Sequence, residues 1–178
     1  NGRLFRYDPE TDAHELCYET TVIGGFTVQR DGSLLLFEDE GTVEVWHDGE
    51  TETVVDSIPE ERDSRFNDVI ADPKGRVFCG TMPTDDRLGR LYRLDPDGTI
   101  TRVLDGLDIP NGMGFTPDRE HMYYTDTRKR EIYRFRYDQF SGSISHRELF
   151  VRVPDEEGEG GPDGMTVDAE GYVWSARW

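Results

Sequence analysis

The chain has 178 residues, of which 34% are hydrophobic and 33% charged, and its 38 acidic and 20 basic residues give a formal net charge of −18. Such an excess of negative charge argues against a nucleic-acid backbone and against an anionic membrane surface as binding partners. It favours either a solvated acidic coat, as in a protein that works in high salt, or an acidic cytoplasmic protein without that adaptation.

Predicted strands recur along the chain with a period of about 45 residues. The opening segment, 2–20, is a predicted hairpin in which apolar and polar residues alternate, and hairpins of the same kind follow at 41–55, 89–104 and 130–150. A second kind of hairpin, two apolar runs joined by a tight turn rich in Asp, Pro and Gly, occupies 24–39, 67–82, 111–126 and 163–178. Such residues supply the backbone angles and local hydrogen bonds of hairpin turns. Four short antiparallel strands per repeat predict an all-β fold, a β-propeller.

We expect a single propeller domain over residues 1–178, with about four blades' worth of strands. Because the sequence begins at Asn1 and stops at Trp178 within a strand pattern, we expect it to be an internal portion of a longer chain, incomplete at both ends. No apolar run approaches membrane-spanning length, so a cytoplasmic location is the default expectation. Cys17 and Cys79 are too few for a disulfide framework, and Cys79 is predicted to be a buried free thiol. The oligomeric state is left open.

Oxygen-bearing side chains occupy the same position in three repeats, where the first strand of each blade begins. They are Asn67, Asn111 and Asp163. Since strands run alternately up and down within a blade, these three positions share one rim and converge on the central channel. Converging amide and carboxylate oxygens favour a hard divalent cation, which needs about six oxygen ligands, some of them water.

Other side chains are predicted at the same rim. The loop 82–89 returns to it with Asp85, and Arg65 lies two residues before the first of the three repeat positions. The acidic loop DEEGEGG, 155–161, is either a lid or a solvated segment. A simpler interpretation also exists, because Asn-Gly and Asp-Gly before a strand are ordinary turn signals and a single Arg is usually a solvated charge.

Four motifs together resemble the SMP-30/gluconolactonase family, which includes regucalcin and bacterial sugar lactonases. They are RFND (65–68), DPKGRVFCGTM (72–82), IPNGMGFTPD (109–118) and PDGMTVDAEGYVW (162–174). The resemblance implies a six-bladed propeller with one divalent cation in its channel. Ca²⁺ is the first expectation, and Zn²⁺, Mg²⁺ and Mn²⁺ are alternatives.

The resemblance also implies roles for individual residues. Asn111 and Asp163 match metal ligands, and Asp163 matches the proposed general base as well. Asn67 matches a residue that holds substrate or metal-bound water, and Arg65 one that contacts the substrate. Asp85 falls where animal members have a substrate-binding Glu, with a shorter side chain. A further family ligand, a Glu in a G-E-x-P-x-W context, has no match in this sequence.

The function implied is metal-dependent hydrolysis of a small sugar lactone, an aldonolactone, to the open aldonic acid. Two alternatives belong to other classes: a phosphotriesterase-like hydrolase that uses a similar cation site, and a calcium-binding propeller without catalytic activity. Turnover of lactones, turnover of phosphotriesters, or metal binding without turnover would distinguish the three.

Overall fold

The computed structural model describes residues 1–155 and 160–178, and nearly all of its regular structure is antiparallel β-sheet. Between β6 and β7 the chain forms one turn of 3-10 helix, η1 (Pro59–Glu61). The predicted all-β class is therefore confirmed. The chain divides into two compact units, Asn1–Phe66 and Asn67–Trp178. None of the helical structure in the described ranges is long and apolar enough to cross a membrane.

The first unit holds a two-stranded and a four-stranded sheet, in the orders β1-β2 and β3-β4-β5-β6. The strands are β1 (Arg3–Asp8), β2 (Ala13–Glu19), β3 (Gly25–Val28), β4 (Leu34–Phe37), β5 (Val43–His47) and β6 (Glu50–Val55). Phe37 and Phe66 are fully buried here and meet edge to face, with ring centroids 5.3 Å apart. This aromatic pair anchors the end of the unit to its four-stranded sheet.

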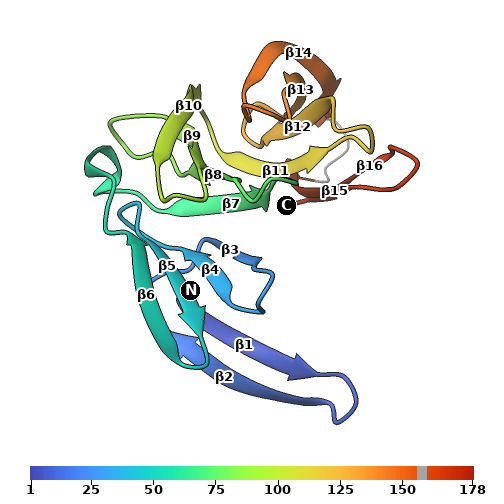
Figure 1. Ribbon diagram of the computed structural model, residues 1–178. Helices are drawn as coiled ribbons and strands as arrows, with labels where there is room; N and C mark the ends of the chain where they lie inside the picture. Colours follow the sequence, from blue (N-terminus) through green and yellow to red (C-terminus); the bar gives the residue numbers. More distant parts are fainter. Residues whose placement is uncertain (156–159) are drawn as a thin grey trace. The chain divides into compact units, whose positions relative to one another are not determined.

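The second unit holds three sheets, in the orders β10-β9-β8-β7, β11-β12-β13-β14 and β15-β16 (Figure 1). Their strands are β7 (Phe66–Ala71), β8 (Val77–Thr81), β9 (Gly89–Leu94), β10 (Ile100–Leu107), β11 (Pro110–Phe115), β12 (His121–Asp126), β13 (Glu131–Tyr137), β14 (Ile144–Arg152), β15 (Pro162–Val167) and β16 (Val173–Arg177). Every hairpin predicted from the repeat is present.

Local turn chemistry explains the hairpins. In the turn after β7, the amide of Gly75 donates to the carbonyl of Asp72 (3.0 Å), and the φ of Gly75 is 83°. The turn after β15 repeats this arrangement: Gly171 donates to Asp168 (3.0 Å) with a φ of 90°. Glycine adopts such positive φ values without steric cost, and the aspartates accept hydrogen bonds from the turn amides.

The hydrophobic core of the second unit lies between its two four-stranded sheets. Its buried members are Phe78, Leu91, Leu107, Met113, Met122, Tyr124, Phe135 and Tyr137. Strands β8, β9 and β10 contribute from one side, and β11, β12 and β13 from the other. Cys79, next to this cluster in the chain, is buried and free, as predicted, and burial raises the pKa of its thiol.

A buried ionic cluster joins the two sheets beside this core. The Nε of Arg76 donates to Oδ2 of Asp72 (2.5 Å), and the Tyr137 hydroxyl donates to the same oxygen (2.6 Å). The Nη1 and Nη2 groups of Arg76 also donate to the carbonyls of Phe140 (3.0 Å) and Gln139 (2.8 Å). The turn after β13 is thus held by an arginine from the turn after β7. Burial, then the hydrogen bond and charge of Asp72, raise the pKa of Tyr137 to about 12.

We expect Asp72→Asn to lower the free energy of unfolding by about 1.5–2 kcal/mol near neutral pH, because hydrogen bonds to a buried charge are lost. Burial alone would raise the pKa of Asp72, but hydrogen bonds from Tyr137 and Arg76 outweigh it and lower the pKa below its ordinary value of 3.8. The carboxylate therefore stabilises the fold above that ordinary pKa, and this contribution is lost as pH falls through the folded-state value.

Urea unfolding of both proteins between about pH 7 and pH 3 measures this effect, and the difference in stability should shrink at the acidic end. Asp118→Asn, in the equivalent exposed turn after β11, is the control, since asparagine retains the turn's hydrogen bonds there. A difference between wild type and Asp72→Asn that stays constant with pH would contradict the assignment.

Candidate functional site

Three predicted site residues occupy the same place in three neighbouring sheets of the second unit. Asn67, Asn111 and Asp163 are each the second residue of the first strand of their sheet, in β7, β11 and β15. All three side chains are partly buried. The repeat position found in the sequence therefore corresponds to one structural position, used three times.

Hydrogen bonds connect these strand starts in series. The Asn67 Nδ2 donates to the carbonyl of Pro110 (2.9 Å), which precedes Asn111. The Asn111 Nδ2 donates to Oγ1 of Thr127 (3.1 Å), whose hydroxyl donates to the carbonyl of Pro162 (2.7 Å). Since Pro162 directly precedes Asp163, each link ends beside the next predicted site residue.

Glycines allow the strands to approach closely at the same level. A Cβ atom built on Gly112 would lie 2.5 Å from the carbonyl oxygen of Asp163 and 2.5 Å from the amide nitrogen of Met165. A Cβ on Gly80 would lie 2.4 Å from Cβ of Pro110. Gly80 of β8 thus packs against the Pro110 ring, and Gly112 packs against the β15 backbone. Strand β11 therefore closely approaches both neighbouring sheets where the site residues begin.

Asp68 also belongs to this region, although its side chain was not among the predicted site residues. Its carboxylate is largely withdrawn from water, and Oδ1 accepts the amide of Val69 (2.9 Å). Burial raises the pKa of Asp68, and the negative charge of Asp163 raises it further. The feature of the sequence that could have identified Asp68 was its place in the RFND motif.

Arg65 and Asp85 stay predictions as substrate contacts. Arg65 belongs to the first unit, where it forms an isolated β-bridge with Asp39 and its Nη1 donates to the carbonyl of Phe66 (2.8 Å). Asp85 is exposed in the loop between β8 and β9. In the acidic loop suggested as a lid, Glu156, Glu157 and Glu159 lie outside the described residues.

The donor atoms fit a hard divalent cation. Within residues 1–155 and 160–178, no group of three or more His, Cys, Asp or Glu side chains is placed to hold a metal. A cation site here would therefore draw on other oxygens as well, such as those of Asn side chains. The orientation of the Asn67 amide follows from its hydrogen bond. The Pro110 carbonyl can only accept, so Nδ2 of Asn67 faces it and Oδ1 points away from Pro110. An amide oxygen and a carboxylate are the ligand types that such cations take.

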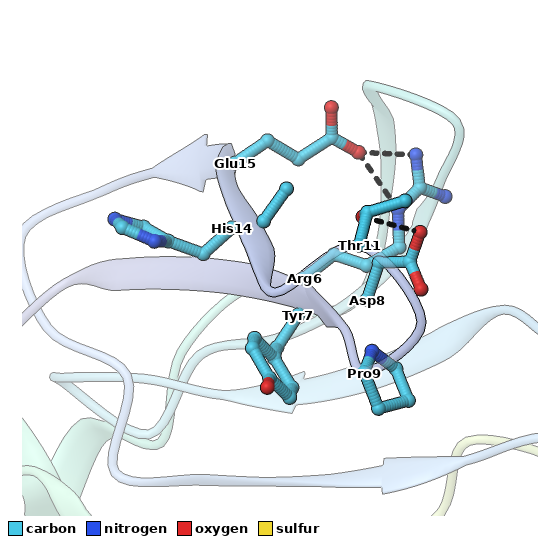
Figure 2. A pocket seen from close by; sticks show the side chains of 8 residues that line it. Arg6, Tyr7, Asp8, Pro9, Thr11, His14 and Glu15 are labelled. Carbon is cyan, nitrogen blue, oxygen red and sulfur yellow. Dashed lines mark hydrogen bonds and ion pairs between the residues drawn. The ribbon is translucent and has the colours of Figure 1, made fainter.

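A separate hollow of about 650 Å³ lies on the β1–β2 hairpin, away in sequence from every predicted site residue. Figure 2 shows its lining side chains, with Arg6 paired to Glu15 and the Thr11 hydroxyl bonded to Asp8. The Arg6 Nε lies 2.7 Å from the Glu15 carboxylate, and Thr11 Oγ1 lies 2.8 Å from Asp8 Oδ2. Its charged groups already satisfy one another, so this hollow does not suggest a catalytic site.

The whole sequence, residues 1–178, matches the family described as SMP-30/Gluconolactonase/LRE-like region. The chain belongs to this family. The resemblance seen in the four motifs is thereby confirmed across the full length. Relatives and solved structures can therefore be compared with this chain in sequence and in fold.

Two relatives match nearly the entire chain. Pentonolactonase XacC of Haloferax volcanii is 59% identical over 181 residues, which cover 100% of this chain and 60% of that protein. Regucalcin of Xenopus laevis is 30% identical over 182 residues, covering 98% of this chain and 60% of that protein. The chain thus spans about 60% of the length of these relatives.

Solved structures confirm the predicted propeller fold. A luciferin-regenerating enzyme superposes with a TM-score of 0.89 at 26% identity, over 99% of this chain and 62% of that one. A gluconolactonase of Xanthomonas campestris superposes with a TM-score of 0.81 at 27% identity, over 99% and 63%. The Dos1 propeller, 13% identical with a TM-score of 0.65 over 95% of this chain and 45% of that one, is similar in fold alone.

Proposed function

We propose that this chain is part of a metal-dependent hydrolase that opens a sugar lactone to its aldonic acid. The observation that supports it most is the series of contacts placing Asn67, Asn111 and Asp163 at equivalent, adjoining strand starts. The lactonase names of the relatives XacC and the Xanthomonas protein support the substrate class. Because XacC is named for pentonolactones, these are the first substrates to test.

The cation would be held by the oxygens of Asn111 and Asp163, with Asn67 as a direct ligand or as the holder of a bound water. Ca²⁺ is the first candidate, because it takes amide and carboxylate oxygens as ligands. When bound, a divalent ion would polarise the lactone carbonyl and lower the pKa of a water molecule.

Asp163 would serve as the general base of the reaction. It would accept the proton of the attacking water with one carboxylate oxygen and return it to the ring oxygen that leaves. The Asn67 amide would orient the water or a substrate hydroxyl. Asp68, which is partly buried one residue after Asn67, would place a second carboxyl group in the same region.

Acid release from pentono- and hexonolactones tests this proposal directly. The protein would be stripped with chelator, assayed, and assayed again with Ca²⁺, Mg²⁺, Mn²⁺ or Zn²⁺ restored. We expect turnover to disappear with chelator and to return with at least one ion. A folded, metal-loaded protein that hydrolyses phosphotriesters but no lactone would replace the proposal by the first alternative. Metal binding without turnover of either substrate class would favour the calcium-binding propeller.

A further inference from the structure

Thr127, which follows the last residue of β12, is held firmly beside the candidate site. Its backbone amide donates to the carbonyl of Ile109 (3.1 Å), and its carbonyl accepts from the amide of Arg130 (3.0 Å). Its methyl group faces Gly161, where a built Cβ would lie 3.0 Å from Thr127 Cγ2. The position of the hydroxyl is therefore determined by the chain on both sides.

Counting protons determines the direction of both hydrogen bonds at this hydroxyl. The carbonyl of Pro162, 2.7 Å away, can only accept, so it takes the single hydroxyl proton of Thr127. Oγ1 must then accept from the Asn111 side chain 3.1 Å away, and the atom facing it must be Nδ2. The Asn111 Oδ1 is consequently turned to the opposite side, as a metal ligand requires.

The same link is built differently one sheet earlier. There, the Asn67 Nδ2 reaches the carbonyl of Pro110 directly, at 2.9 Å. Between β11 and β15 the equivalent amide and prolyl carbonyl, of Asn111 and Pro162, are bridged by the Thr127 hydroxyl. The link between β7 and β11 is thus a direct hydrogen bond, whereas the link between β11 and β15 contains one additional hydroxyl group. This hydroxyl lies between the strand starts that carry Asn111 and Asp163.

We infer that Thr127 is a positioning residue that orients the Asn111 amide and sets the spacing between Asn111 and Asp163 for a divalent cation. This inference rests on the proposed function. Hydrogen-bond partners that orient metal ligands typically contribute about 10–100-fold to metal affinity. Thr127 would act in this way through Asn111 and the Pro162 carbonyl, without touching the ion.

Calcium affinity of the metal-stripped full chain, measured by calorimetric titration with Ca²⁺ alone, tests the inference. Thr127→Val keeps the shape but removes the hydroxyl, and we expect Ca²⁺ to bind about 10–100-fold more weakly. Thr127→Ser restores the hydroxyl, and its affinity should return to within about threefold of wild type. Urea unfolding of the metal-free proteins reports stability separately.

Thr125→Val is a matched control, two residues away in β12 and paired with Asn111 across the ladder. The Thr125 hydroxyl is buried and has no hydrogen-bond partner in the structure described for this chain, so its removal should leave Ca²⁺ affinity unchanged. Should Thr127→Val fail to fold, Thr127→Ala removes the same hydroxyl with less crowding at Gly161. If neither folds without the ion, Thr127 is a structural residue and the inference is overturned.

The remaining outcomes separate this inference from the proposed function. A wild type that binds Ca²⁺, with Thr127→Val binding within about threefold of it, would overturn the role of Thr127 and leave the metal site standing. A folded wild type that binds none of Ca²⁺, Mg²⁺, Mn²⁺ and Zn²⁺ would overturn the metal site itself, and the role of Thr127 with it.

Discussion

Replacing Asp163 by alanine is expected to reduce lactone turnover by about 10³-fold or more, because one change removes a metal ligand and the general base. Two backbone contacts position Asp163: the hydrogen bond from the Thr127 hydroxyl to the carbonyl of Pro162, and the close approach of Gly112 to the Asp163 carbonyl oxygen. Neither contact involves the Asp163 side chain, so the fold should survive the substitution. Acid release from a pentonolactone at saturating Ca²⁺ measures the effect.

Asp163→Asn separates the two roles of the carboxylate. Asparagine still offers an oxygen to the cation but cannot accept a proton, so this variant should bind Ca²⁺ measurably while turnover falls about 10²–10⁴-fold. Asp168→Asn, at the other end of β15, is the matched control and should keep wild-type turnover. If Asp163→Asn kept turnover within about tenfold of wild type, Asp163 would not be the base, and Asp68 would be the next residue to replace.

Gly112→Ala is expected to lower the free energy of unfolding by about 2–3 kcal/mol and to weaken Ca²⁺ binding. The added Cβ would lie 2.5 Å from backbone atoms of both Asp163 and Met165, so β11 and β15 would have to move apart. Backbone atoms cannot rotate away as a flexible side chain can. Since Asn111 and Asp163 lie on these two strands, their separation would change as well.

Gly164→Ala is the matched control for Gly112→Ala, which tests the close packing of β11 against β15. Gly164 also neighbours a predicted ligand in the chain, but a Cβ built there meets nothing within 4 Å. Its effect on the free energy of unfolding should stay under about 0.5 kcal/mol. Urea unfolding and Ca²⁺ titration of both variants give the comparison. Equal stability of the two would contradict the close packing of β11 against β15.

The hairpins and the repeated site position were predictable because the interactions that produce them are local. The turn from Asp72 to Gly75 is determined by a glycine with positive φ and an aspartate that accepts nearby amides. Alternating apolar residues indicated which strand faces are buried. The same local pattern aligned Asn67, Asn111 and Asp163, and each proved to be the second residue of its strand.

Thr127 and Asp68 show where prediction from the sequence ended. Thr127 is a single threonine after a strand, and nothing in its local sequence distinguishes it from Thr125, whose hydroxyl has no hydrogen-bond partner in the described structure. Asp68 was visible as part of RFND, but its proximity to Asp163 was not. The cluster of Arg76 and Asp72 with Tyr137 likewise joins turns that are distant along the chain.

The sequence by itself determined the family, the all-β repeat and the register that aligns Asn67, Asn111 and Asp163. Each of these depends on short local motifs and on their recurrence along the chain. Only the tertiary structure decided how these positions are joined. The Asn67–Pro110 bond spans 43 residues and the Thr127–Pro162 bond spans 35, so both depend on how separate sheets pack. Which hydroxyl orients which amide is a property of that packing, because a hydrogen bond acts only between atoms about 3 Å apart.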